Sequence, residues 1–143
     1  MSETVDIKIN LSSTNWESRY PGARIYIDEI LIYENLIVQP TEVSWSGAVN
    51  ESEHKIIVEM YNKKDGDTVL DDHDNILNDV VLNIDGISID DVELGQIIWS
   101  KSVYYPNSEY APNQLTNCVN LGWNGCWELT FSSPVYLWFL ENL

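Results

Sequence analysis

Hydrophobic and polar residues alternate with a period of two along much of the chain. Val5, Ile7, Ile9 and Leu11 are separated by polar residues, which is the pattern of a strand with one buried face. Further runs rich in β-branched and aromatic residues, which favour strands, lie at 25–33, 43–45, 56–61, 82–94 and 97–105. Turn residues interrupt these runs at short spacings. The pattern predicts one all-β domain over residues 1–143, an antiparallel β-sandwich or jelly roll.

Two acidic pairs divide longer runs into two arms. Asp28-Glu29 is a candidate two-residue turn, and Asp90-Asp91 marks a bend. The hexapeptide 25–30 matches 87–92 in residue type at every position but the second. Two hairpins of similar build produce such a match without duplication of the chain.

The Asn124-Gly125 pair is a strong turn signal. Asn-Gly supplies the two positive φ angles of a type I′ turn, so we expect a hairpin between Val119–Trp123 and Cys126–Phe131. Alternation then places three large residues in the core: Trp127, Leu129 and Phe131. Trp123 falls on the opposite, wetter face.

The same hairpin keeps Cys118 and Cys126 apart. Five pair positions correspond to about 17 Å, whereas a disulfide requires Cα atoms within about 7 Å. We therefore expect two free thiols, as in a protein made in a reducing cytoplasm.

The C-terminal segment begins with Ser132-Ser133-Pro134, a cap serine followed by proline at a first helical position. This favours a short helix over Val135–Leu143. The alternative is a last strand buried on both faces, because residues 135–140 are continuously apolar.

Charge excludes several function classes. The 143 residues include 23 acids and 7 bases, a formal net charge of −16, so a general nucleic-acid binder is excluded and an anionic membrane surface is disfavoured. No apolar run reaches the roughly 18 residues of a membrane span, and the first residues lack the basic start of a signal peptide. A hydrophobic content of 44% excludes a disordered acidic tail.

Acids concentrate in the middle of the chain. Thirteen of the 23 lie between Glu51 and Glu93, and the densest group is Asp65, Asp67, Asp71, Asp72, Asp74 and Asp79. Such a loop has oxygen ligands for Ca²⁺, although the EF-hand spacing is not met. One interpretation is a calcium site that the ion stabilises, and the other is a solvated loop between two strands.

Aromatic residues concentrate at the other end, with ten of sixteen between 99 and 139. Residues 103–117 form a long stretch of Tyr, Pro, Asn and Ser, a composition that suits contact surfaces. The candidate contact residues are Tyr104, Tyr105, Tyr110 and Trp123, which could stack on sugar rings or pack on a protein neighbour. Alternatively, some of them simply cover the end of the sandwich.

Catalytic signatures are absent from the sequence. It has two histidines and no nucleophile elbow, P-loop or zinc-protease motif. His54 is expected to be an ordinary strand residue, and nothing selects a pair of carboxylates for glycoside hydrolysis. We therefore expect a protein that is not an enzyme.

Two stretches carry a family resemblance: IIVEMYNKKDGDTVLDDHDNILNDVVLNIDGISIDDVELG and the ending LGWNGCWELTFSSPVYLWFLENL. They resemble small uncharacterised proteins of tailed phages of aquatic bacteria, which implies a virion or an infected cell as the context. More distantly, the pattern is similar in fold type to the β-sandwich of calcium-dependent xylan-binding modules. That resemblance implies a loop-bound calcium that contacts sugar hydroxyls.

Two functions follow as expectations. The first is an accessory virion protein, a capsid decoration or a tail or fibre component made in the host cytoplasm, which contacts other virion proteins or its own copies through an aromatic surface. The second is a carbohydrate-binding module that depends on Ca²⁺ and is not itself catalytic. One protein could have both functions.

Overall fold

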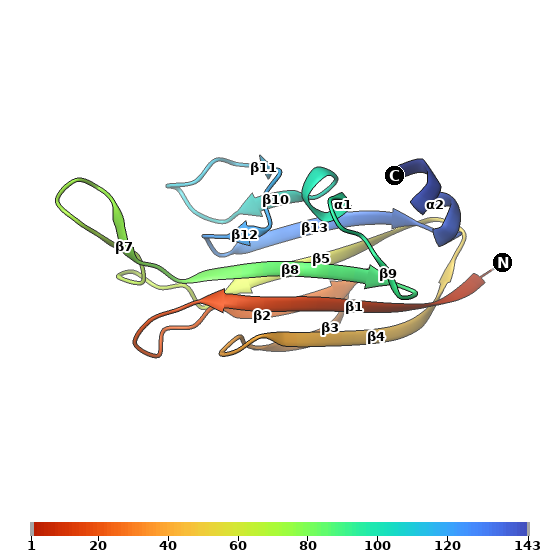
Figure 1. The fold of residues 1–143 in the computed structure, drawn as a ribbon, viewed down its shortest axis with the longest axis horizontal. Coiled ribbons are helices and arrows are strands. Elements are labelled where there is room, and N and C mark those ends of the chain that lie inside the picture. Colours follow the sequence, from red (N-terminus) through yellow and green to blue (C-terminus); the bar gives the residue numbers. More distant parts are fainter. Residues whose placement is uncertain (1, 143) are drawn as a thin grey trace.

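Two antiparallel sheets pack face to face in the computed structural model, which describes residues 2–142 (Figure 1). One sheet contains β1 (Ser2–Thr14), β4 (Thr41–Asn50), β8 (Val81–Ile89), β9 (Val92–Glu93) and β12 (Asn120–Leu121). The other contains β2 (Gly22–Ile27), β3 (Ile30–Leu36), β5 (Glu53–Tyr61), β10 (Val103–Pro106), β11 (Leu115–Thr116) and β13 (Gly125–Ser132). The predicted all-β sandwich is confirmed.

Strand order brings distant segments together. The first sheet has the order β12-β8-β1-β4, with β9 paired to β8, and the second has the order β11-β10-β13-β5-β2-β3. A separate ribbon of β6 (Val69–Leu70) and β7 (Ile76–Asn78) projects from one end of the sandwich, and α2 (Val135–Asn142) lies at the other end (Figure 1). Within residues 2–142, neither helix has the length and apolar character needed to cross a membrane.

The core forms from the alternating positions that the sequence singles out. On β1 these are Val5, Ile7, Ile9 and Leu11, all buried. Trp127, Leu129 and Phe131 of β13 are fully buried as expected. The Trp127 indole Nε1 donates to the Cys118 carbonyl (3.0 Å), which satisfies the polar group of this large side chain inside the core.

Both acidic turns form as predicted, and each is held by the same kind of hydrogen bond. Asp28 and Glu29 have φ angles of 49° and 71°, and Asp90 and Asp91 have 51° and 65°. The Asp28 carboxylate accepts from the amide of Lys55 on the neighbouring strand (2.9 Å), and Asp90 accepts from the Asp6 amide in the same way (2.8 Å). The two matching hexapeptides therefore form two hairpins of similar build, each with this contact.

The strand predicted over residues 97–105 is wrong in its first half. Residues 97–100 form the short helix α1 (Ile97–Ser100), and the strand begins at Val103. Ile97 and Ile98 are both buried. Consecutive side chains of a strand point to opposite faces, whereas a helical turn can direct both toward one core.

The hairpin predicted at Asn124-Gly125 is also wrong. β12 pairs with β8 in one sheet, whereas β13 pairs with β5 and β10 in the other, so residues 122–124 cross between the sheets. Gly125 has a φ of 151°, and a Cβ there would lie 2.3 Å from the Tyr105 carbonyl. Glycine is required here for a close backbone approach rather than for a tight turn.

The C-terminal helix and the free thiols agree with expectation. α2 covers the end of the sandwich, where Trp138 packs edge-on against Phe131 with ring centroids 6.3 Å apart. Cys118 and Cys126 are both free. The prediction of two free thiols is therefore right, but the hairpin on which it rests does not form.

Candidate functional site

A pocket of about 730 Å³ opens at the end of the sandwich from which the β6–β7 ribbon projects. One wall is the loop that follows β5, from Lys63 to Leu70, and the other is Asn107–Tyr110, which follows β10. Trp123 and Asn124, just before β13, lie between the two walls. Because β5, β13 and β10 are antiparallel neighbours, the end of β5, the start of β13 and the end of β10 lie at the same end of the sheet.

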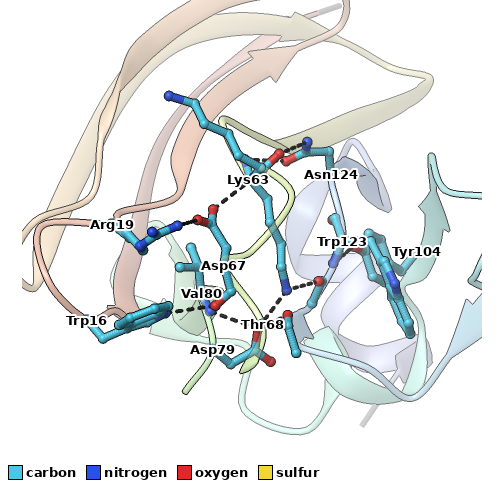
Figure 2. A network of polar contacts seen from close by, with 12 residues as sticks. Trp16, Arg19, Lys63, Asp67, Thr68, Asp79, Val80, Tyr104, Trp123 and Asn124 are labelled. Carbon is cyan, nitrogen blue, oxygen red and sulfur yellow. Dashed lines mark hydrogen bonds and ion pairs between the residues drawn. The ribbon is translucent and has the colours of Figure 1, made fainter. Parts of the chain in front are cut away.

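Trp123 is held in this pocket by its backbone. The Tyr104 hydroxyl accepts from the Trp123 amide (3.0 Å) and donates to the Trp123 carbonyl, as Figure 2 shows. Trp123 itself is half-buried and packs partly against the core. The backbone of Trp123 is therefore fixed at the pocket, and the residue remains partly accessible.

Tyr104 is not a contact residue, and that part of the sequence prediction is wrong. Its side chain is fully buried, because alternation along β10 points it into the core and Tyr105 outward. Burial raises the pKa of the Tyr104 hydroxyl well above its ordinary value, although the hydrogen bond to Trp123 opposes the rise. Tyr104 therefore positions Trp123 and stays a neutral donor.

The two other predicted aromatic residues are exposed, but only one lines the pocket. Tyr110 is 85% exposed on the wall formed by Asn107–Tyr110. Tyr105 lies on the outer face of the six-stranded sheet, beside Cys126 in register, and does not line the pocket. The structure thus brings Trp123 and Tyr110 together and leaves Tyr105 elsewhere.

Lys63 is a site residue that the sequence analysis missed. Its ammonium Nζ donates to the Asp79 carboxylate (2.7 Å) and to the Gly122 carbonyl (2.6 Å). The Asn124 side chain brackets the Lys63 backbone, accepting from its amide and donating to its carbonyl at 3.0 Å each (Figure 2). Lys63 therefore joins the acidic loop to the segment that carries Trp123. A lysine beside an acidic stretch is visible in the sequence, but no local pattern identifies its partners.

Two of the predicted calcium ligands bind basic side chains instead. Asp67 is almost fully buried and accepts from Arg19 through Oδ1 (2.8 Å) and from the Lys64 amide through Oδ2 (2.8 Å). Asp79 Oδ1 accepts from Lys63 Nζ, from Thr68 Oγ1 (2.6 Å) and from its neighbour's amide. Burial acts to raise the pKa of Asp79, but these hydrogen bonds outweigh it and hold the pKa below its ordinary value.

The four remaining aspartates do not complete a site. Asp71 accepts from the amides of His73 and Asn75 within its own turn, which lowers its pKa. The other three, Asp65, Asp72 and Asp74, are exposed, and of these only Asp65 lines the pocket. In residues 2–142 no three His, Cys, Asp or Glu side chains meet as a metal-binding group, whereas Ca²⁺ takes six to eight oxygen ligands. The arrangement does not fit a calcium site, so the structure does not support the calcium response that one interpretation of the sequence predicts.

A second polar cluster at the opposite end contains a serine, a histidine and an aspartate. His54 Nδ1 lies 2.5 Å from Asp28 Oδ2, and its Nε2 lies 3.4 Å from Ser52 Oγ. Nε2 is closer to the Asn50 carbonyl, at 2.8 Å, and must donate to it because a carbonyl only accepts. An Nε2 that carries this proton cannot act as a base toward Ser52, so the cluster is structural.

This cluster makes stability depend on pH. Burial acts to lower the pKa of His54, but hydrogen bonds to the Asn50 carbonyl and Asp28 outweigh it, so the pKa lies above its ordinary value. The stabilisation is therefore fully present below the unfolded pKa of about 6.5 and is lost as the pH rises through the folded pKa. We expect the melting temperature of the wild type to exceed that of His54→Gln by more at about pH 5.5 than at about pH 8.5. An equal difference at both values would contradict this assignment.

Comparison with known proteins supports the fold class. No family model matches the chain, and no curated protein matches it in sequence, so the resemblance to phage proteins stays a prediction. The fold is similar to that of carbohydrate-binding modules. One similar structure is vCBM60 in complex with galactobiose, with a TM-score of 0.54 at 15% identity over 89% of this chain and 97% of that one.

A second similar structure is the selenomethionine form of vCBM60, from work linking two families of calcium-dependent carbohydrate-binding modules by circular permutation. Its TM-score is 0.57 at 11% identity, over 87% of this chain and 89% of that one. These matches confirm the expected fold-type similarity to calcium-dependent carbohydrate-binding sandwiches.

Proposed function

We propose that the protein binds carbohydrate in the pocket formed by Lys63–Leu70, Asn107–Tyr110 and Trp123. The observation that carries this proposal is the position of Trp123, a partly buried tryptophan with an anchored backbone that lines the pocket between two polar loops. An aromatic face of this kind stacks on the apolar C–H face of a pyranose ring, while polar neighbours bind its hydroxyls. The structural similarity to vCBM60, which was solved with galactobiose, supports the same ligand class.

The pocket combines a flat aromatic surface with hydrogen-bonding groups. Asn107, Ser108 and Glu109 line the wall that ends in the exposed Tyr110. Tyr110 faces solvent beside the pocket, so it can contact a second sugar unit beyond the one on Trp123. A chain of two or more units fits this arrangement better than a single sugar.

The charge of the protein favours a neutral glycan. The formal net charge of −16 repels uronic and sulfated sugars at long range and lowers their rate of encounter. Neutral hexose or pentose polymers experience no such repulsion. Binding to neutral polysaccharides should therefore be stronger than binding to acidic polymers of similar length, most clearly at low salt.

A glycan array with neutral and acidic oligosaccharides, followed by calorimetric titration of galactobiose and xylobiose, tests the proposal. Saturable binding to a neutral oligosaccharide is the expected result. Binding to none of the neutral glycans would contradict it.

A role in an assembly is a second candidate, favoured by one observation. α2 exposes three large apolar side chains close together in sequence, Tyr136, Leu137 and Leu140, and apolar groups that lie together on a surface can form an interaction site. We expect light scattering to detect association that increases with salt, because screening weakens the repulsion between strongly acidic copies. A monomer at all salt concentrations would count against self-association. The virion role is a separate prediction, which mass spectrometry of purified particles would test.

A further inference from the structure

We propose that Lys63 is an internal cation that organises the carbohydrate pocket, so that this pocket does not depend on calcium for its structure or its binding. The inference rests on the proposed carbohydrate-binding function. It departs from the calcium dependence named with one similar vCBM60 structure.

The Lys63 ammonium lies where a cation is needed. Asp79 ends the acidic loop, and its carboxylate is only 17% exposed. A carboxylate in that position is destabilising unless a positive charge or several donors compensate it. Lys63, itself 14% exposed, supplies the charge at 2.7 Å, and Thr68 supplies a further hydrogen bond.

The beginning of the loop is held by a second basic side chain. Arg19 pairs with the buried Asp67 and stacks on the Trp16 ring, with its guanidinium carbon 4.6 Å from the ring centroid. The Trp16 indole donates to the Asp67 carbonyl (2.7 Å). Both ends of the loop that carries the β6–β7 ribbon are thus neutralised by side chains of the protein (Figure 2).

The same ammonium also binds the backbone next to Trp123. Its second contact, the Gly122 carbonyl at 2.6 Å, belongs to the residue directly before Trp123. A lysine has three donors and no acceptor, so it can hold a carboxylate and a carbonyl together as a metal ion would. Lys63 therefore fixes the wall of the pocket and the position of Trp123 relative to each other.

The thermal part of the test compares Lys63→Met with Lys101→Met, an exposed lysine that does not line the pocket. We expect the wild type to melt at the same temperature in excess Ca²⁺ and in chelator. Lys63→Met should melt roughly 5 °C or more below the wild type, because Asp79 loses its partner. Lys101→Met should melt at the same temperature as the wild type. The loss in Lys63→Met/Asp79→Asn should be smaller than the sum of the two single losses.

The binding part measures affinity for the best neutral oligosaccharide in chelator and in Ca²⁺. The wild type should bind equally in both buffers, and Lys63→Met should bind at least about tenfold more weakly at a temperature where it is folded. A wild type that calcium stabilises by several degrees, or that loses tenfold affinity in chelator, would overturn the inference, as would equal melting of the two lysine variants. A wild type that binds no glycan in either buffer contradicts the proposed function instead, since the thermal part addresses Lys63 alone.

Discussion

Trp123→Ala is expected to reduce carbohydrate affinity by about tenfold or more while leaving the protein folded. Trp123 is the tryptophan that lines the pocket, and loss of a central aromatic contact of the hot-spot kind costs about 1.4 kcal/mol or more of binding free energy, which is tenfold in affinity. Its side chain is only half-buried. The loss of stability should therefore remain clearly below the ~3–5 kcal/mol expected for a fully buried tryptophan.

Calorimetric titration of the wild type and the variant measures this effect, with Tyr105→Ala as the matched control. Tyr105 is exposed and comes from the same aromatic segment, but it does not line the pocket, so its removal should leave the affinity unchanged. Equal losses in both variants would mean that the sugar binds elsewhere. An unfolded Trp123→Ala protein would show that Trp123 is a core residue.

Trp127→Ala is expected to have the largest effect on stability, a loss of about 3–5 kcal/mol. Trp127 is fully buried, and its removal leaves both a large cavity and the Cys118 carbonyl without its donor. For a domain of this size the melting temperature should fall by roughly 10 °C or more. Chemical denaturation of Trp127→Ala and Trp123→Ala measures the two losses of stability. A Trp123→Ala protein less stable than Trp127→Ala would show that Trp123, and not Trp127, is the more important core residue.

The core could be predicted from sequence because alternation is a local property. Trp127, Leu129 and Phe131 share a face whichever strand lies beside them, so their burial was expected even though the hairpin that contains them was wrong. Strand partners are not local in this way. Asn124-Gly125 has the composition of a turn, but it serves a crossing between sheets because Asn124 binds Lys63, 61 residues earlier in the chain.

The candidate site could be predicted in part for the same reason. Tyr110 follows from the aromatic composition of the C-terminal third, and Trp123 follows from a hairpin that does not form, yet both line one pocket. Tyr104 was misassigned because the phase of β10 decides which of two adjacent tyrosines is buried. Lys63 was missed because its two partners, Asp79 and Gly122, lie 16 and 59 residues away, and no local pattern indicates such contacts.

An NMR titration can show whether the pocket around Trp123 binds a neutral glycan. Addition of galactobiose or the best neutral oligosaccharide to ¹⁵N-labelled protein should shift the Trp123 indole resonance and the amides of Lys64, Gly66, Ser108 and Tyr110, which line the pocket. The indole resonances of Trp99 and Trp138, which do not line it, should not move. Saturable shifts confined to the pocket are the predicted result. Shifts centred on another face, or none at any accessible concentration, would contradict glycan binding in this pocket.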